Sequence, residues 1–240
     1  MTNHADRSAR VRAFAAYHPG FFPLVGLVAL CVAMSVVTDR FLSWENFSNI
    51  GRQVSINAII AVGMTIVIIT GGIDLSVGAV MTLSMTVAAG AMLSPLPVAF
   101  SIVLGLATGL AFGAINGTLI AYARLPAIIV TLATMEIPRG LALLYTNGYP
   151  QTGLPGSFSA LGQGSIAGLQ NPTLVMLAVV AMGFVLMRST LAGRYFYAIG
   201  GNEEAARISG VPVRRYKLLA YVLSGGSAAL AGIVLSSRLM

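Results

Sequence analysis

The sequence is poor in charged residues, lysine, histidine and cysteine, and each shortage excludes a class of function. Charged residues make up 9% of the 240 positions, against roughly 25% in a soluble domain. The single lysine, Lys217, is not preceded by a glycine loop, so no G-x-x-x-x-G-K-[ST] phosphate site exists. His4 and His18 both lie before the first apolar run, so no histidine triad or metal site can form inside a membrane. Cys31 is alone, which excludes a disulfide within one chain.

Long apolar runs separated by short polar segments dominate what is present, and 57% of the residues are hydrophobic. This pattern predicts an all-α, polytopic helical membrane protein with about seven transmembrane helices and no catalytic or metal site. A polar tail over residues 1–20 precedes the membrane domain, 21–240. The expected spans are residues 21–37, 54–70, 77–92, 98–121, 127–145, 172–187 and 218–235.

The distribution of basic residues predicts the orientation of the chain. The segment 188–217 carries six basic residues against Glu203 and Glu204, so we expect it in the cytoplasm. The segment 146–171 has no lysine or arginine, so we expect an external loop there. Alternating spans then give a cytoplasmic N-terminus. The net charge of +7 is accordingly read as an orientation signal and not as a nucleic-acid surface.

One stretch, Ile69–Gly78, places a carboxylate between two apolar runs. We expect one helix to end near Thr70, a break at Gly71-Gly72, and a second helix capped by Asp74. Broken helices at membrane depth are tolerated where they line a cavity or are buried in protein. The alternative is a tight cytoplasmic turn with a solvated Asp74. The candidate substrate-pathway residues are Gly71, Gly72, Asp74, Ser76 and Asn116.

The fourth expected span repeats glycine at every fourth position. Such a ladder lets another helix backbone approach closely, and we favour this packing role over direct contact with a ligand. Asn116 lies beside the ladder and needs a hydrogen-bond partner, for which we favour a neighbouring helix over a substrate. The ladder consists of Gly105, Gly109, Gly113 and Gly117.

The fifth expected span contains Glu136, Pro138 and Arg139. The two charged residues are three apart and can pair on one helix face, which we favour over a role in a substrate pathway. Pro138 predicts a bend or a freed carbonyl in this helix.

The basic segment contains the signals of a short helix. Asn202 suits an N-cap, Glu203 and Glu204 fall in the first turn, and Gly210 is a natural C-terminal stop. So short a helix is not stable alone, so we expect it to dock on another surface. A solvated loop helix without a partner is the alternative.

Residues 204–210 read Glu-Ala-Ala-Arg-Ile-Ser-Gly and resemble the E-A-A-x-x-x-G signature of importer-type ABC transporter permeases. The I-x-L-P ending of the wider family is absent, since residues 220–223 read Ala-Tyr-Val-Leu. The resemblance implies that the helix couples to an ATP-binding cassette subunit. The implied coupling residues are Asn202, Glu203, Glu204, Ala205, Ala206 and Gly210.

Further stretches are similar to ribose/xylose-type sugar permeases, in family order from about Phe41 to Met240. The resemblance implies import of a monosaccharide or small polyol across the bacterial inner membrane. Implied partners are a periplasmic sugar-binding protein, a second permease chain (identical or homologous), ATP-binding subunits and the lipid bilayer. This chain would bind no cofactor itself, because ATP and Mg²⁺ belong to the partner subunit. The stretches are 70–78, 116–117, 126–132, 139–140 and 193–210.

Two features depart from the resemblance. Glu136 and Pro138 stand where uncharged, helix-compatible residues are expected. The family also continues with further spans, so we expect a truncated, fragmentary or split permease. Two other functions compete with import: a secondary transporter that uses Asp74 as a proton or sodium site, and a non-transporting membrane scaffold.

Overall fold

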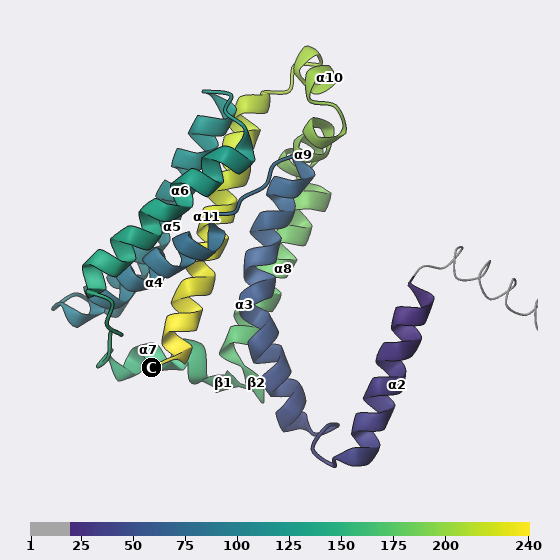
Figure 1. Ribbon diagram of the computed structural model, residues 1–240, viewed down its shortest axis with the longest axis vertical. Coiled ribbons are helices and arrows are strands. Elements are labelled where there is room, and N and C mark those ends of the chain that lie inside the picture. The colour runs from purple at the N-terminus through teal and green to yellow at the C-terminus, as the bar shows by residue number, and fades with distance from the viewer. Residues whose placement is uncertain (1–19) are drawn as a thin grey trace, which may run out of the picture. The chain divides into compact units, whose positions relative to one another are not determined.

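A computed structural model describes residues 20–240 (Figure 1). The polar tail expected over 1–20 therefore lies, except for Gly20, outside the described residues. The chain forms two units, 1–50 and 51–240, and α3 runs from the first into the second. The elements are α2 (Phe21–Val37), α3 (Trp44–Ile69), α4 (Val77–Leu93), α5 (Val98–Ala121), α6 (Ala127–Thr146), α7 (Gly156–Gln163), β1 (Ser165–Ile166), β2 (Leu169–Gln170), α8 (Asn171–Ser189), α9 (Leu191–Gly201), α10 (Glu203–Ile208) and α11 (Val213–Arg238).

The first unit contains α2 and the start of α3. No residue of α2 is buried, and Cys31 on this helix is a free, exposed cysteine. A short turn joins the two helices, and the N–H of Asn46 donates to the hydroxyl of Ser43 at 3.2 Å. This bond satisfies one of the free N–H groups at the start of α3.

The second unit is built around α11, which packs against α5 through the predicted glycine ladder. A Cβ atom added at Gly109 or Gly113 would collide with α11 carbonyl oxygens, and one added at Gly117 would come within 2.9 Å of the Leu218 backbone. Gly105 instead faces α4, at Ser84 and Ala88. The packing role of the ladder is confirmed, because the absence of side chains lets these backbones touch.

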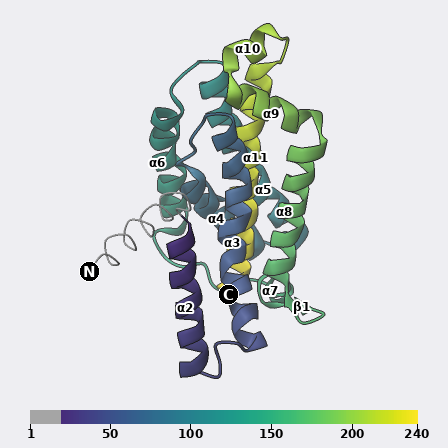
Figure 2. The ribbon, with the colours of Figure 1, turned by 90° about the vertical axis from the view of Figure 1, so that its right-hand side faces the viewer.

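Two groups of helices pack on α11. The helices α4, α5 and α6 lie together, with α4 in contact with α5, α6 and α11 (Figures 1 and 2). The second half of α3 packs with α8, α9 and α11 through two apolar clusters. One cluster contains Val67, Phe196 and Tyr221, and the other contains Ile59 and Ala231.

Each of the seven predicted spans overlaps one helix, although α3 and α11 are longer than the spans predicted there. Within residues 20–240, α3, α5, α6, α8 and α11 are long and apolar enough to cross a membrane, and α2 and α4 are shorter apolar helices of 17 residues. Pro138 is accommodated inside a continuous α6. The fold is that of a polytopic helical membrane protein, as predicted. The side of the membrane on which each connection lies stays a prediction.

Two segments expected to be loops are more ordered than the sequence suggested. Residues 146–171 contain α7 and a two-stranded antiparallel hairpin, β1–β2. This polar stretch is ordered by tertiary contact, since Phe158 is buried and the Ser237 hydroxyl donates to its carbonyl. Residues 188–217 contain α9 and the first turn of α11 in addition to the predicted short helix. In the first segment, contact of α7 with α11 overrides weak local propensity, and in the second α9 is held by contacts with α8, α10 and α11.

Candidate functional site

The predicted break separates α3 from α4. The first helix ends at Ile69, the second begins at Val77, and Gly71 adopts a φ of +78° that side chains rarely tolerate. The prediction that Asp74 caps the second helix is wrong, because Ser76 holds the N-cap position without a side-chain capping bond. Asp74 Oδ1 instead accepts the N–H of Ser76, one residue before the helix, at 3.0 Å.

Asp74 is buried, with 2% of its surface exposed, so the alternative of a solvated turn is wrong. Its Oδ1 atom also accepts the Ser76 hydroxyl at 2.6 Å. Its Oδ2 atom accepts the hydroxyl of Ser224, on α11, at 2.8 Å. These three donors are neutral, so hydrogen bonds compensate for the burial of the Asp74 carboxyl group.

Asn116 extends this network to α5 and α6. Its Nδ2 atom donates to the Ser76 hydroxyl at 2.8 Å, and its Oδ1 atom accepts the Thr134 hydroxyl at 2.7 Å. The Thr131 hydroxyl lies within 3.3 Å of the carbonyl of Ile73 in the break. Asn116 therefore bonds neighbouring elements, as favoured from the sequence. The break is held by side chains from α5, α6 and α11.

Gly72 packs directly against α11. A Cβ atom at this position would collide with the hydroxyl of Tyr221, a fully buried side chain. Ser224 lies three residues further along α11, and residues three apart share one helix face. One face of α11 thus touches the break twice, through Tyr221 and Ser224.

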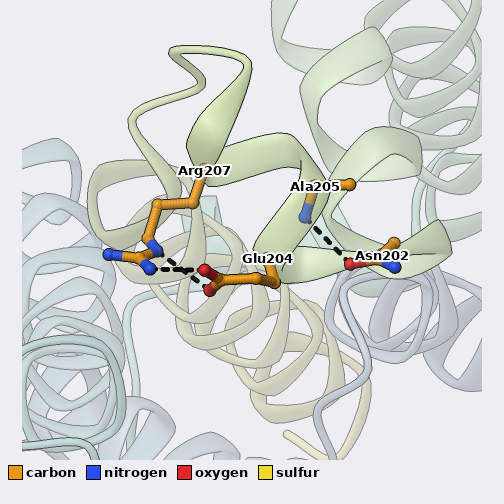
Figure 3. Close-up of polar contacts among 4 residues, drawn as sticks. All are labelled: Asn202, Glu204, Ala205 and Arg207. Atoms are coloured by element: carbon orange, nitrogen blue, oxygen red, sulfur yellow. Dashed lines mark hydrogen bonds and ion pairs between the residues drawn. The ribbon is translucent and has the colours of Figure 1, made fainter.

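The short helix α10 forms with the predicted residues. Asn202 is its N-cap, and the Asn202 Oδ1 atom accepts the N–H of Ala205 at 2.9 Å (Figure 3). Ser209 follows its last residue, and Gly210 turns the chain with a φ of +85°. Cap and stop are both local signals, which is why the sequence predicted them.

Ion pairs fix the two acidic residues of α10. Glu204 accepts two hydrogen bonds from the guanidinium of Arg207, one of them from Nε at 3.0 Å (Figure 3). The hydrogen bond from Arg207 holds the pKa of Glu204 below its usual value, so its carboxylate stays charged. Lys217 Nζ, on α11, bonds Glu203 at 2.5 Å. The other face of α10 buries Ala206 against Ile199 and Val213.

A cavity of about 630 Å³ lies between the break and α10. Gly71, Gly72 and Tyr221 line one part of it, and Glu203, Glu204 and Lys217 line another. Two predicted sites that are 130 residues apart in the chain therefore border one space. Asp74, Ser76 and Asn116 do not line it, because they are buried in the network behind the glycines.

A second cavity, of about 970 Å³, lies on the other side of the break. Leu75 and the first turns of α4 line it, together with α6, the segment 148–154 and the end of α11. Figure 1 places α10 and α7 at opposite ends of α11, and this cavity contacts the α7 end. Residues 71–75 therefore form a septum with a cavity on each side.

The sequence predicted the break at Gly71-Gly72 and the short helix α10, but it did not indicate the residues that hold the break. Tyr221, Ser224 and Thr134 carry contacts across 18 to 150 residues of chain, and no local pattern marks them. The pairing of Glu136 with Arg139 is confirmed at 3.6 Å. Within residues 20–240, no three His, Cys, Asp or Glu side chains lie together in a group that could hold a metal ion.

Known proteins resemble the chain over nearly its whole length. The family model described as branched-chain amino acid transport system / permease component matches residues 46–240. The ribose import permease RbsC of Bacillus subtilis is 46% identical over 219 residues, which cover 90% of this chain and 68% of the relative. RbsC of Escherichia coli K12 is 40% identical over 220 residues, again 90% of this chain and 68% of the relative.

A xylose transport system permease, XylH of Haemophilus influenzae, is 32% identical over 284 residues, covering 91% of this chain and 75% of that protein. No solved structure matches the chain significantly. The family match covers more than half of the chain and includes the break, the network and α10. This chain therefore belongs to the BPD_transp_2 family of transport-system permease components.

Proposed function

We propose that the chain is the transmembrane permease subunit of an ATP-driven, binding-protein-dependent importer of a monosaccharide or related polyol. The observation that carries the proposal is the similarity to ribose and xylose permeases along a chain that holds a capped, glycine-stopped α10. This similarity favours ATP-driven import over a gradient-driven carrier with Asp74 as its ion site. The permease itself performs no chemistry.

In this proposal α10 is the docking element for the ATP-binding subunit. Glu203, Glu204 and Ile208 are exposed, whereas Ala206 anchors the helix to the rest of the chain. A helix of six residues gains little stability by itself, so its capped and ion-paired form suits a preformed binding surface. ATP and Mg²⁺ would bind on that partner subunit and not on this chain.

The helix α11 offers a route from the docking helix to the septum. Lys217 pairs with Glu203 on α10, Tyr221 contacts Gly72, and Ser224 bonds Asp74. The spacing of four and then three residues places these side chains on one face of α11. A displacement of α10 would therefore move the two contacts that hold the break.

The septum itself is the element we assign to gating. Gly71 and Gly72 border the cavity beside α10, and Leu75 borders the cavity at the other end. Transporters of several folds place discontinuous helices between alternately opened cavities. Import then proceeds from the α7 end, where a periplasmic sugar-binding protein would deliver substrate, to the α10 end. A second permease chain, identical or homologous, would complete the transporter in the inner membrane.

The test is capture of candidate ATP-binding subunits by the detergent-solubilised chain. Wild type should retain the subunit, and Glu204→Arg should lose it because the substitution reverses an exposed charge on α10. Glu45→Arg is the matched control, since it reverses an exposed acidic residue in the first turn of a different helix, α3. Equal capture by all three proteins would remove α10 as the docking element. No capture by wild type would contradict the ATP-driven assignment.

A further inference from the structure

The ion pair in α6 occupies an unexpected position. α6 has 20 residues, and Glu136 and Arg139 are its only charged ones. Counted from Ala127 at 1.5 Å per residue, they lie roughly 14 and 18 Å along a helix of about 30 Å, near its middle. The described residues leave 61% of the Glu136 side chain and 65% of the Arg139 side chain uncovered.

An uncovered ion pair at that depth does not suit a lipid surface. Charged side chains inside the bilayer almost always face the bundle interior or a water-filled cavity. Arg139 lines the 970 Å³ cavity, as do Met135, Ala142 and Thr146 of the same helix. Arg139 therefore borders a space that water can occupy, and the ion pair holds Glu136 beside it, outside the lining of the cavity.

The chemistry of this cavity fits a neutral, hydroxyl-rich ligand. Arg139 is the one charged side chain in its lining among the described residues, and Glu136 balances that charge. The other polar groups are neutral hydroxyls and an amide, which donate and accept hydrogen bonds. Pockets of roughly 300 to 1,000 Å³ are typical of small-molecule sites. The neutral polar residues of the lining include Thr82, Thr86, Thr146, Tyr149, Gln151 and Thr152.

We infer that this cavity, between α4, α6 and the segment 148–154, binds the transported polyol, with Arg139 as its specificity-determining residue and Glu136 as the residue that positions the Arg139 guanidinium. The inference rests on the proposed function. In it, substrate is bound in this cavity before the septum opens. The guanidinium of Arg139 presents several N–H donors to neighbouring hydroxyl oxygens of one ring, and the hydroxyl and amide groups of the lining can accept hydrogen bonds in return. Leu75, which belongs to the septum, lines the same cavity.

The first test follows uptake by the complete importer, with the sugar that wild type transports among ribose, xylose and arabinose. Arg139→Gln should raise KM about tenfold, the scale expected for a lost hydrogen bond to a charged group, while capture of the ATP-binding subunit is retained. Arg188→Gln, an exposed arginine at the end of α8 outside the cavity, should leave KM unchanged. A double substitution, Glu136→Leu with Arg139→Leu, separates a binding role from a contact with lipid or another helix. Unchanged KM in that variant would overturn the inference.

The second test measures occupancy directly in a Cys31→Ser background. Thr82→Cys, in the cavity wall, should react with a maleimide more slowly when the transported sugar is present. Ser157→Cys, exposed on α7 outside the cavity, should react at the same rate with and without sugar. Arg139→Gln should abolish the protection at Thr82→Cys. Uptake without protection would overturn this site and leave the proposed function standing, whereas absence of ATP-dependent uptake of any sugar would contradict the proposed function itself.

Discussion

Carboxylates in two regions of this permease are stabilised in opposite ways. Asp74 is buried and accepts hydrogen bonds from a backbone N–H and two hydroxyls. Glu203 and Glu204 are exposed, and each pairs with a cation. An exposed ion pair contributes little to stability, whereas an unmatched buried polar group is costly. Substitutions in the septum should therefore destabilise the folded protein. Substitutions in α10 should instead weaken binding of its partner subunit.

The largest effect is expected at Asp74. Asp74→Leu leaves the hydroxyls of Ser76 and Ser224 without their acceptor, and unsatisfied buried groups cost about 1–3 kcal/mol each. The variant should give little monodisperse protein in detergent. Asp74→Asn keeps one acceptor oxygen and should fold with a smaller loss of thermal stability.

Asp39→Leu serves as the control, because Asp39 is exposed in the first unit. Its yield and melting temperature should match wild type. Equal losses in Asp74→Leu and Asp39→Leu would mean that the hydrogen bonds to Asp74 do not decide the fold of the septum.

A second, smaller effect is expected at Gly72. Gly72→Ala places a methyl group against the Tyr221 hydroxyl, and overpacking of this kind costs typically about 1–3 kcal/mol. Gly26→Ala adds the same methyl group inside α2, where no atom lies within 4 Å. Uptake and melting temperature should fall in the first variant only. Similar behaviour of both variants would contradict a tight contact between the septum and α11.

The two regions also differ in how far the sequence could predict them. In α10 the cap joins Asn202 to Ala205 and the stop is Gly210, so every signal lies within nine residues. In the septum the break was visible in Gly71-Gly72, but Asp74 finds its partner Ser224 at a separation of 150 residues. The sequence contains many serines on helices rich in small residues, and it does not indicate which of them bonds Asp74. Only the packing of α11 on α5 brings Ser224 to that position. The cap assigned to Asp74 failed for the same reason, since tertiary donors compete with the local N–H groups.

Ser224 tests whether the two regions communicate. Ser224→Ala removes the bond to Asp74 Oδ2 and leaves the Ser76 donors in place, so a moderate loss of about 0.5–1.5 kcal/mol is expected for one hydrogen bond. Ser227→Ala, one turn along α11, removes a hydroxyl that lies beside Gly63 of α3 and not at the break, and it should be neutral.

The informative measurement for these variants is sugar imported per ATP hydrolysed. If α11 carries motion from α10 to the septum, Ser224→Ala should lower this ratio while the ATP-binding subunit is still captured. An unchanged ratio in Ser224→Ala, with stability reduced, would make the contact purely structural.

The smallest effect is expected at Asn202, the cap of α10. Asn202→Ala removes the acceptor for the Ala205 N–H, and the loss of such a cap costs about 1 kcal/mol. Asn202→Asp keeps the acceptor and adds a charge that suits a helix N-terminus, so it should retain the helix. Neither variant should change the melting temperature of the membrane helices, because α10 contributes little buried surface beyond Ala206. Binding of the ATP-binding subunit should weaken in Asn202→Ala and be preserved in Asn202→Asp. If both variants bind equally well, the docking surface forms on contact with the partner, and the preformed geometry of α10 loses its role in recognition.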